Sequence, residues 1–246
     1  MSRLIIIPTY NEAQNAPILI RRLIKHIPHT DILVIDDGSP DGTAGVIESL
    51  QQEFTTLHLL KRRQKSGLGS AYRKGFAWGL ERGYSELIEM DADMSHRVRD
   101  LARMIEIKDA NPAISLVIGS RWTKGGTTTN WPKSRELLSR TANLYVRIML
   151  GMGVKDVTAG FRIYSAEILR KIDLASIKSE GYSFQIEMTR EVYGLGGHIV
   201  EVPITFRERE QGASKMSKQI VFEAMLLVTL WGLKRLLATS SQSGGS

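Results

Sequence analysis

Asp91 and Asp93 are separated by one residue and directly follow the predicted strand Leu87 to Met90. In an extended chain, positions i and i+2 point to the same side, so the two carboxylates would lie together. Hard oxygen ligands suit Mg²⁺ or Mn²⁺, which take one or two protein carboxylates and complete their shell with water and substrate phosphates. We therefore predict a metal site here. The alternative is that one aspartate caps the next helix while the other is solvated.

A second acidic pair, Asp36 and Asp37, follows an apolar run and leads into the turn-rich stretch GSPDGT. An acid at this point of a nucleotide-binding sheet commonly accepts hydrogen bonds from ribose or base. The first apolar run leads into PTYNE (8–12) and not into G-x-G-x-x-G, which disfavours a dinucleotide cofactor. KSGLGSA (65–71) lacks the Lys-Ser/Thr pair of a P-loop. We interpret the acidic pair as part of a nucleotide site, with a purely structural turn as the alternative.

Basic residues gather in two clusters in the second part of the chain. One surrounds GGTTTN and the other surrounds QGAS; their members are Arg121, Lys133, Arg135 and Arg140 in the first, with Ser134 and Ser139 interleaved, and Arg207, Arg209, Lys215 and Lys218 in the second. Arginine offers phosphate a planar fork and lysine a point charge, so the clusters predict two anion sites. A solvated basic face is the alternative. We expect no nucleic acid partner, because aromatic residues are not interleaved and no recognition motif appears.

The elements that must position these residues follow from the hydrophobic pattern. Short β-branched runs alternate with amphipathic stretches, which is typical of βαβ units and a mostly parallel sheet. We predict strands at 4–7, 32–35, 57–60, 87–90 and 116–118, and helices at 15–27, 43–52, 70–82 and 97–108. Ligands of such sheets collect at the carboxyl ends of the strands, where the acidic motifs lie.

The second part of the chain is less regular and reads as insertions that close over the site. Its expected elements are a loop at 122–132, helices at 134–150 and 183–193, and strands at 161–164 and 199–206. We expect one α/β domain at 1–218, followed by an apolar helix at 219–238 and a disordered tail at 239–246.

Composition agrees with a globular protein. The 246 residues are 42% hydrophobic and 24% charged, which excludes disorder and collagen. No cysteine is present, so thiol catalysis, iron–sulfur clusters and disulfides are excluded. The net charge of +7 lies wholly after residue 100, because residues 1–100 carry 13 charges of each sign. An anionic partner is therefore expected in the second part. Leu4 to Ile7 is too short an apolar run for a secretory signal.

A very apolar stretch, Ile220 to Leu233, contains one acid, Glu223. Fourteen residues are too few to span a bilayer, which takes about 20. The nearby Lys215, Lys218 and Lys234 suit anionic headgroups, so we predict a helix that lies on a membrane surface or docks on a membrane-embedded partner protein. Packing on the core is the alternative.

Several motifs, taken together and in order, carry a family resemblance. They are IIIPTYNE, VIDDGSPDGT, MDADMSH, GSRW, KSRELLSRTAN, DVTAGFRIY, GYSFQIE and GASK, from residue 4 to about 218. The chain resembles the dolichol-phosphate or polyprenyl-phosphate mannose synthases, inverting glycosyltransferases of family two with a GT-A fold. NWPKSRELLSR looks most like the actinobacterial, membrane-peripheral members. The resemblance implies transfer of mannose from GDP-mannose to a polyprenyl phosphate, with Mg²⁺ or Mn²⁺, at the cytoplasmic face of the membrane.

The resemblance also implies roles for single residues. The donor would contact Pro8, Tyr10, Glu12, Asp37, Asp91, Ala92, Asp93, Arg209 and Lys215. The metal would be held by Asp91 and Asp93, with Ser95 where some relatives place a third ligand. The acceptor phosphate would meet Arg121, Arg135, Ser139 and Arg209. Asp91, Asp93, Arg121, Arg135 and Lys215 would carry catalysis. His96 is given little weight, because the proline expected nearby is absent.

Chemistry alone gives the outline of a mechanism. A phosphate monoester is mostly a dianion at neutral pH, so the nucleophile needs no general base. The site must instead stabilise charge on the leaving diphosphate and lower the repulsion between two anions. Two rival functions remain open at this stage: a family-two transferase with another donor, such as a UDP-sugar, and a non-catalytic subunit that binds lipid phosphate.

Overall fold

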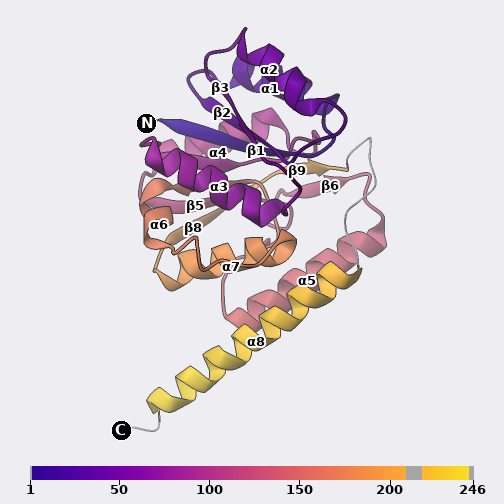
Figure 1. Ribbon diagram of the computed structural model, residues 1–246. Helices are drawn as coiled ribbons and strands as arrows, with labels where there is room; N and C mark the ends of the chain where they lie inside the picture. Colours follow the sequence, from indigo (N-terminus) through magenta and orange to yellow (C-terminus); the bar gives the residue numbers. More distant parts are fainter. Residues whose placement is uncertain (1, 209–217, 244–246) are drawn as a thin grey trace.

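The computed structural model describes residues 2–208 and 218–243. A seven-stranded sheet forms the centre, with strand order β3-β2-β1-β4-β7-β5-β8 (Figure 1). The strands are β1 (Arg3–Thr9), β2 (Asp31–Asp36), β3 (Leu57–Lys61), β4 (Glu86–Glu89), β5 (Ile114–Ser120), β7 (Arg162–Ser165) and β8 (His198–Pro203). All neighbours pair in parallel except β7, which runs antiparallel between β4 and β5. The expected mostly parallel α/β sheet is confirmed.

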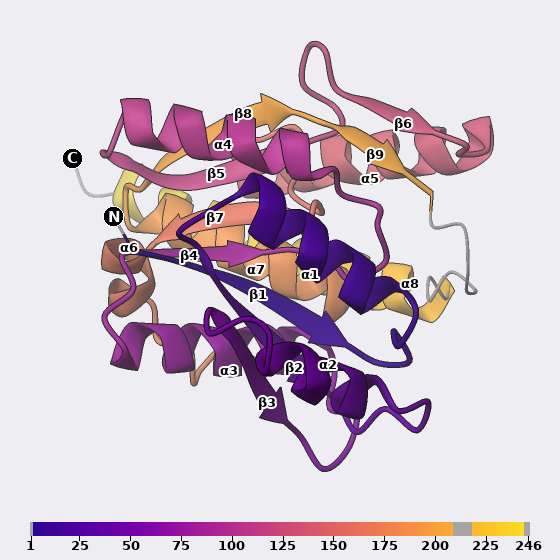
Figure 2. The same cartoon turned by 90° about the horizontal axis from the view of Figure 1, so that it is seen from above.

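The described residues form eight helices. They are α1 (Asn15–His26), α2 (Thr43–Gln51), α3 (Leu68–Glu81), α4 (Val98–Ala110), α5 (Lys133–Leu150), α6 (Ala166–Lys171), α7 (Gly181–Gly194) and α8 (Lys218–Ser243). Figures 1 and 2 show α1, α2 and α4 on one face of the sheet, with α3, α6 and α7 on the other. The short α6 had not been expected from the sequence.

The alternation of β1 explains the two layers. Side chains of successive strand residues point to opposite faces. Leu4 and Ile6 therefore pack with α3 residues in one cluster, whereas Ile5 and Ile7 pack with α1 residues in the other. All four are fully buried. Because β1 is covered on both sides, it reads as a continuous apolar run, as parallel strands usually do.

One expected strand is two strands in the structure. The predicted strand 199–206 divides into β8 and β9 (Thr205–Arg207), which belong to different sheets. The division has a local cause, since the Ile204 N–H donates to Ser120 at the end of β5, while the Ile204 carbonyl accepts from Thr127. The chain thereby leaves β5 and pairs with β6 (Thr127–Thr129), inside the predicted loop 122–132 (Figure 2).

The C-terminal helix packs along α5 and α7 and then extends beyond the sheet layers (Figure 1). It runs to Ser243, so residues 239–243, expected as tail, continue the helix; adding residues to a formed helix costs little. α5 ends at Gly151, which has φ 64°, and a Cβ there would meet the Arg235 guanidinium of α8. Within the described ranges, no helix has the length and apolarity needed to cross a membrane.

Candidate active site

A cavity of about 560 Å³ opens at the carboxyl ends of β1, β2 and β4. It brings together nine of the predicted site residues: Pro8, Tyr10, Glu12, Asp37, Asp91, Ala92, Asp93, Arg121 and Arg135. Pro8 lies near the end of β1, Tyr10 and Glu12 follow β1, Asp37 follows β2, and the aspartate pair follows β4. The parallel arrangement of these three strands is what places motifs about 80 residues apart in sequence around one space.

The two members of the early acidic pair have different environments. Asp36 belongs to the turn, because its carboxylate accepts hydrogen bonds from the Thr9 hydroxyl at 3.0 Å and from both the backbone and the hydroxyl of Ser39, at 3.0 and 2.6 Å. Asp37 lines the cavity. Burial raises the pKa of Asp37, and the Arg62 guanidinium, 3.2 Å away, works in the opposite direction. Only Asp37 is therefore placed for a ligand.

Lys65 is a cavity residue that sequence reasoning missed. Its Nζ lies 4.4 Å from the centroid of the Tyr10 ring, and both residues line the cavity beside Asp37. The next residue, Ser66, donates its N–H to Asp37 at 3.3 Å. This end of the cavity thus combines an aromatic face, a carboxylate and a cation, which together can hold a nucleobase and its phosphates.

The aspartates after β4 meet the requirements of a hard divalent cation. Asp91 and Asp93 line the same cavity, and Asp93 is 9% exposed. His96 lies 3.5 Å from Asp91, and its ring stacks on Phe161 at 4.5 Å. The Ser95 N–H donates to Asp93 at 3.1 Å, and the buried Ser95 hydroxyl has no hydrogen-bond partner among the described residues. Ser95 does not line the cavity.

The described residues contain no cluster of three or more His, Cys, Asp or Glu side chains able to hold a metal ion. Two carboxylates nevertheless fit Mg²⁺ or Mn²⁺, because such ions take one or two protein carboxylates and fill the remaining positions with substrate phosphates and water. The donor set at Asp91 and Asp93 therefore suits an ion that is bound together with a nucleotide diphosphate.

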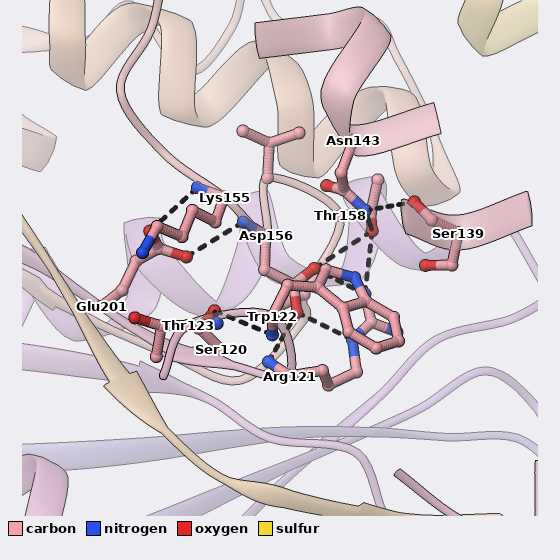
Figure 3. A network of polar contacts seen from close by, with 12 residues as sticks. Ser120, Arg121, Trp122, Thr123, Ser139, Asn143, Lys155, Asp156, Thr158 and Glu201 are labelled. Atoms are coloured by element: carbon pink, nitrogen blue, oxygen red, sulfur yellow. Dashed lines mark hydrogen bonds and ion pairs between the residues drawn. The ribbon is translucent and has the colours of Figure 1, made fainter. Parts of the chain in front are cut away.

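Arg121 also lines the cavity and is held by a buried carboxylate (Figure 3). Asp156 is fully buried and accepts hydrogen bonds from the Arg121 backbone N–H, Nε and Nη2, at 2.8, 2.8 and 2.6 Å. Nη2 also donates to Thr158 at 2.9 Å. Burial disfavours the charged guanidinium, but the charge and hydrogen bonds of Asp156 outweigh it, so the pKa of Arg121 is raised. Arg121 stays cationic and fixed in direction.

A second layer fixes the partners of Arg121 (Figure 3). The Glu201 carboxylate accepts the backbone N–H groups of Lys155 and Asp156 at 2.8 and 3.0 Å. Asn143 of α5 donates to the Thr158 hydroxyl at 3.2 Å. β8 and α5 therefore both hold the loop that orients the guanidinium. Sequence reasoning predicted Arg121 but not Asp156, although DVTAG is one of the quoted motifs.

Arg135 joins Arg121 around one aromatic ring. Its guanidinium carbon lies 4.1 Å from the Trp131 ring centroid, and that of Arg121 lies 5.4 Å from the same centroid. Arg135 also forms an ion pair with Glu208, while its buried Nε has no hydrogen-bond partner among the described residues. The two cations thus share one wall of the cavity, which is the arrangement needed to bind a phosphate dianion.

A smaller crevice of about 50 Å³ adjoins the cavity. Arg121, Trp131 and Arg135 line both spaces, whereas the remaining walls of the crevice come mainly from apolar residues of α5, α7 and α8: Leu138, Ala142, Val146, Ile186, Ala224, Met225 and Val228. Ser139 lies in this crevice and not in the cavity. Arg209 and Lys215 fall outside the described residues.

The start of α7 is the other part that sequence reasoning missed. Glu180 accepts the N–H groups of Gly69 and Ser70, at 2.7 and 2.9 Å, and thereby caps the first turn of α3. Glu180, Tyr182 and Gln185 all line the cavity. Tyr182 and Gln185 belong to GYSFQIE, which supported the resemblance but received no role, and Glu180 directly precedes that motif. Tyr182 and Gln185, within a motif that the resemblance already included, were the available signal.

A buried acid lies beneath the cavity. Glu89 of β4 is fully buried, and burial raises its pKa to about 8, although Arg162 and a hydrogen bond from Gln185 lower it. The Gln185 Nε2 group donates to Glu89 at 2.8 Å. Arg162, also fully buried, donates to the Ala159 carbonyl at 2.6 Å and so fixes the loop before β7. Glu89 and Arg162 thus support the floor of the cavity.

The comparison with known families agrees with this geometry. The family described as Glycosyl transferase family 2 matches residues 4–173, which include the strands and loops that bear the nucleotide end and the aspartate pair. The chain belongs to glycosyl transferase family 2. The family-two resemblance carried by the motifs is thereby confirmed, and the chain is a glycosyltransferase by family.

This family 2 glycosyltransferase has well-matched relatives. It is 50% identical over 232 residues to a protein named polyprenol monophosphomannose synthase from Mycolicibacterium smegmatis, with 94% of this chain and 87% of the relative covered. It is 52% identical over 233 residues to a protein named undecaprenyl-phosphate mannosyltransferase from Micrococcus luteus, with 95% of each covered. Both names agree with the mannose synthase resemblance.

A solved structure confirms the fold. Glucosyl-3-phosphoglycerate synthase from Mycobacterium tuberculosis, in complex with Mn²⁺, UDP-glucose and phosphoglyceric acid, matches with a TM-score of 0.69 at 18% identity. The match covers 93% of this chain and 79% of that one. The GT-A-like arrangement of a mostly parallel sheet flanked by helices is therefore shared across a wide sequence distance.

Proposed function

We propose that this glycosyltransferase transfers mannose from GDP-mannose to a polyprenyl phosphate, with inversion at the sugar. One observation carries the proposal: Arg121 and Arg135 line both the polar cavity and the apolar crevice between α5, α7 and α8. An acceptor held there would have its phosphate on two cations and its first apolar carbons in the crevice. A lipid phosphate has this distribution of charge. The names of the two relatives, which include polyprenol and undecaprenyl phosphate, support the same acceptor.

GDP is the nucleotide that Asp37 favours. Guanine presents two adjacent N–H donors on one edge, whereas uracil presents a single N–H between two carbonyl oxygens. A carboxylate accepts two donors at once. Asp37 lines the cavity next to the Tyr10 ring and Lys65, so it can accept from the base while the ring covers its face. Pro8 and Glu12 complete this end.

Asp91 and Asp93 would hold Mg²⁺ or Mn²⁺ on the donor diphosphate, with Ala92 alongside the nucleotide and Ser95 behind the pair. When bound, the ion would neutralise negative charge on the leaving group. The Ser95 N–H fixes one oxygen of Asp93 by a 3.1 Å bond, which restricts the directions that carboxylate can take. Lys215 and Arg209, outside the described residues, are proposed as further contacts to donor diphosphate and acceptor phosphate.

The acceptor phosphate attacks the anomeric carbon from the side opposite to the diphosphate. A C–O bond to the acceptor forms, the C–O bond to GDP breaks, and GDP leaves with the electron pair. The acceptor is already a dianion near neutral pH, so no side chain has to remove a proton. Arg121 and Arg135 lower the repulsion between the two anions, and Asp156 keeps the Arg121 fork in one orientation. Ser139, in the crevice, would meet the acceptor beside its phosphate.

A lipid acceptor has to be met at a membrane, and the structure has a surface for it. α5 and α8 together expose a row of large apolar residues that we name the α5–α8 face: Leu137, Leu144, Ile148, Leu226, Leu230, Leu233 and Leu237. Each is between 47% and 70% exposed. The neighbouring Arg140, Arg147, Lys234 and Arg235 side chains are also exposed, which suits anionic headgroups. We propose that this face lies on the cytoplasmic surface of the membrane.

The opposite side of α8 is packed on the protein. Ala224 and Val228 are buried, and the Thr229 hydroxyl lies 2.7 Å from that of Tyr145 on α5. Core packing and surface exposure therefore occupy different sides of the same helix. A membrane-embedded partner could cover the α5–α8 face in place of lipid, and vesicles without any added protein distinguish the two.

The test is to mix the protein with Mg²⁺, labelled GDP-mannose and a short polyprenyl phosphate, and to extract into organic solvent. We expect label in the organic phase, lost on adding excess chelator and in Asp91→Asn. Labelled UDP-glucose in a parallel reaction should give no transfer. Transfer of label from UDP-glucose but not from GDP-mannose would overturn the proposed donor. Binding of polyprenyl phosphate without transfer from either donor would indicate a non-catalytic protein that binds lipid phosphate.

A further inference from the structure

Gln185 has an unusual position in the cavity. It is 2% exposed, lines the cavity, and comes from the first part of α7. Its Nε2 donates to the Glu89 carboxylate at 2.8 Å, whereas its Oε1 is buried and has no hydrogen-bond partner among the described residues. Leaving a buried acceptor unsatisfied costs about 1–3 kcal/mol, so such an atom calls for an explanation. A ligand that brings a hydroxyl group would supply the missing donor.

The surroundings hold the Gln185 amide in this orientation. Glu89 precedes Asp91 by two residues on the same chain segment, so the bond to Glu89 fixes Gln185 next to the aspartate pair. One turn further along α7, the Thr189 hydroxyl donates to the Gln185 backbone carbonyl at 2.8 Å and accepts from Arg162 at 3.0 Å. In the Gln185 side-chain amide, the nitrogen Nε2 therefore already has a hydrogen-bond partner, whereas the oxygen Oε1 has none among the described residues.

Gln185 lines the cavity that also contains the aspartate pair and the two arginines. The nucleoside end of the cavity is formed by Tyr10 and Asp37, and the aspartate pair follows β4. Arg121 and Arg135 mark the entry of the acceptor on the other side. In a displacement with inversion, the sugar lies between the leaving diphosphate and the incoming phosphate. Gln185 lines the same cavity, is bonded to Glu89 two residues before the aspartate pair, and has the cavity residue Gly160 beside its amide.

We propose that Gln185 recognises the sugar of the donor, with its Oε1 accepting a hydrogen bond from a ring hydroxyl. The inference rests on the proposed donor site and adds a residue that selects the sugar independently of the nucleotide. A polar acceptor of this kind discriminates strongly, because an analogue without the hydroxyl leaves it unpaired. The absence of a side chain at Gly160 keeps room for the sugar beside the amide, since an added Cβ would lie 3.7 Å from Nε2.

The test separates the sugar from the nucleotide by titrating GDP and GDP-mannose, both with Mg²⁺, into each protein. In Gln185→Met we expect the affinity for GDP to stay within about twofold and that for GDP-mannose to fall about 10-fold or more. Gly160→Ala adds a methyl group in ordinary van der Waals contact with the Gln185 amide, without a clash, and should give the same selective loss. Gln51→Met is the control, because Gln51 also donates through Nε2, to Leu57 at 3.1 Å, but lies away from the cavity.

Monodeoxy GDP-mannoses give an independent measurement. On the wild type, the analogue that lacks the recognised hydroxyl should bind about 10-fold more weakly than GDP-mannose. On Gln185→Met, that analogue and GDP-mannose should bind with the same affinity. Equal losses for GDP and GDP-mannose in both variants, or no loss in either, would overturn the role of Gln185. If the wild type binds UDP-glucose and not GDP-mannose, the proposed donor fails, and the same titrations with UDP and UDP-glucose decide on Gln185 separately. A wild type that binds no nucleotide sugar contradicts both.

Discussion

Removal of Asp156 is the perturbation that most directly tests how the site is held. Asp156→Ala takes the acceptor from three donors of Arg121, namely its backbone N–H, Nε and Nη2. The Arg121 side chain is 6% exposed and would remain buried as an unpaired charge, with the Thr158 bond at 2.9 Å as its remaining hydrogen bond among the described residues. Loss of one partner of a buried ion pair typically costs about 3–5 kcal/mol. We expect the free energy of unfolding to fall by that amount.

The chain contains a matched control for this measurement. Arg21 and Glu53 form a two-point ion pair with distances of 2.8 and 2.9 Å, close to those of Arg121 and Asp156, but both side chains are about half exposed. Pairs in such surroundings contribute little. Urea unfolding followed by circular dichroism should therefore show a large shift of the midpoint for Asp156→Ala and almost none for Glu53→Ala, with similar slopes.

A double variant separates the charge from the packing. Arg121→Met combined with Asp156→Leu removes both charges, and apolar replacement of a buried pair is often neutral in stability. We expect stability within about 1–3 kcal/mol of the wild type, because the backbone N–H of Arg121 still loses its acceptor. Transfer should fall about 10²-fold or more, because the acceptor phosphate loses its cation. If Asp156→Ala were as harmless as Glu53→Ala, or if the double variant were as unstable as the sum of the single variants, the reasoning would be refuted.

Three further predictions concern the metal site, the buried acid and the membrane face. Asp93→Asn should lower transfer about 10²-fold or more while the melting temperature of the metal-free protein stays close to that of the wild type. Glu89→Gln should gain stability over the wild type as the pH rises from about 4.5 to about 8, by no more than about 5 kcal/mol, measured by urea unfolding in chelator. Leu230→Asp should weaken binding to anionic vesicles in a flotation assay.

The sign for Glu89 follows from proton binding. With its pKa raised from 4.5 to about 8, the folded protein holds a proton that the unfolded chain releases between these values, so stability falls as the pH rises. A glutamine at this position has no proton to lose. An advantage of Glu89→Gln that is equal at pH 5 and pH 8 would contradict the assignment.

The controls for the other two variants come from the same chain. For the membrane face, Ile18→Asp is the matched control, because Ile18 is 48% exposed and Leu230 47% exposed, but Ile18 lies on α1, which covers the face of the sheet opposite to α7. Equal flotation of the two variants would count against membrane contact through that face. For the metal site, transfer by Asp93→Asn at the wild-type rate would remove the aspartate from catalysis.

Much of the nucleotide half was predictable from sequence, since local rules decide it. A mostly apolar run followed by Asp91 and Asp93 specifies a strand and two carboxylates at its end, and parallel pairing then brings them to Asp37. No local rule separated Asp36 from Asp37. Ser39 and Thr9 decide that Asp36, and not Asp37, forms the hydrogen bonds of the turn. Thr9 lies on another strand, β1.

The acceptor half was less accessible to sequence reasoning, because its contacts join distant segments. Asp156 and Arg121 are 35 residues apart, and an isolated aspartate in a loop carries no signal of its partner. The division of the predicted strand 199–206 depends on hydrogen bonds of Ile204 to two other segments. The apolar residues exposed on α5 became visible only when the structure showed which side of the helix is covered.

The position of β7 has a consequence for the time course of synthesis. β4, which precedes the aspartate pair, has β7 as its neighbour on one side, and Glu89 pairs with Arg162, 73 positions later in the chain. At about 5–20 residues per second, a ribosome needs roughly 4–15 s to make that interval. Throughout it, one edge of β4 is an open strand edge next to acidic residues, and such edges recruit other strands. Nascent chains that stall before β7 are therefore the species that chaperones should bind most strongly.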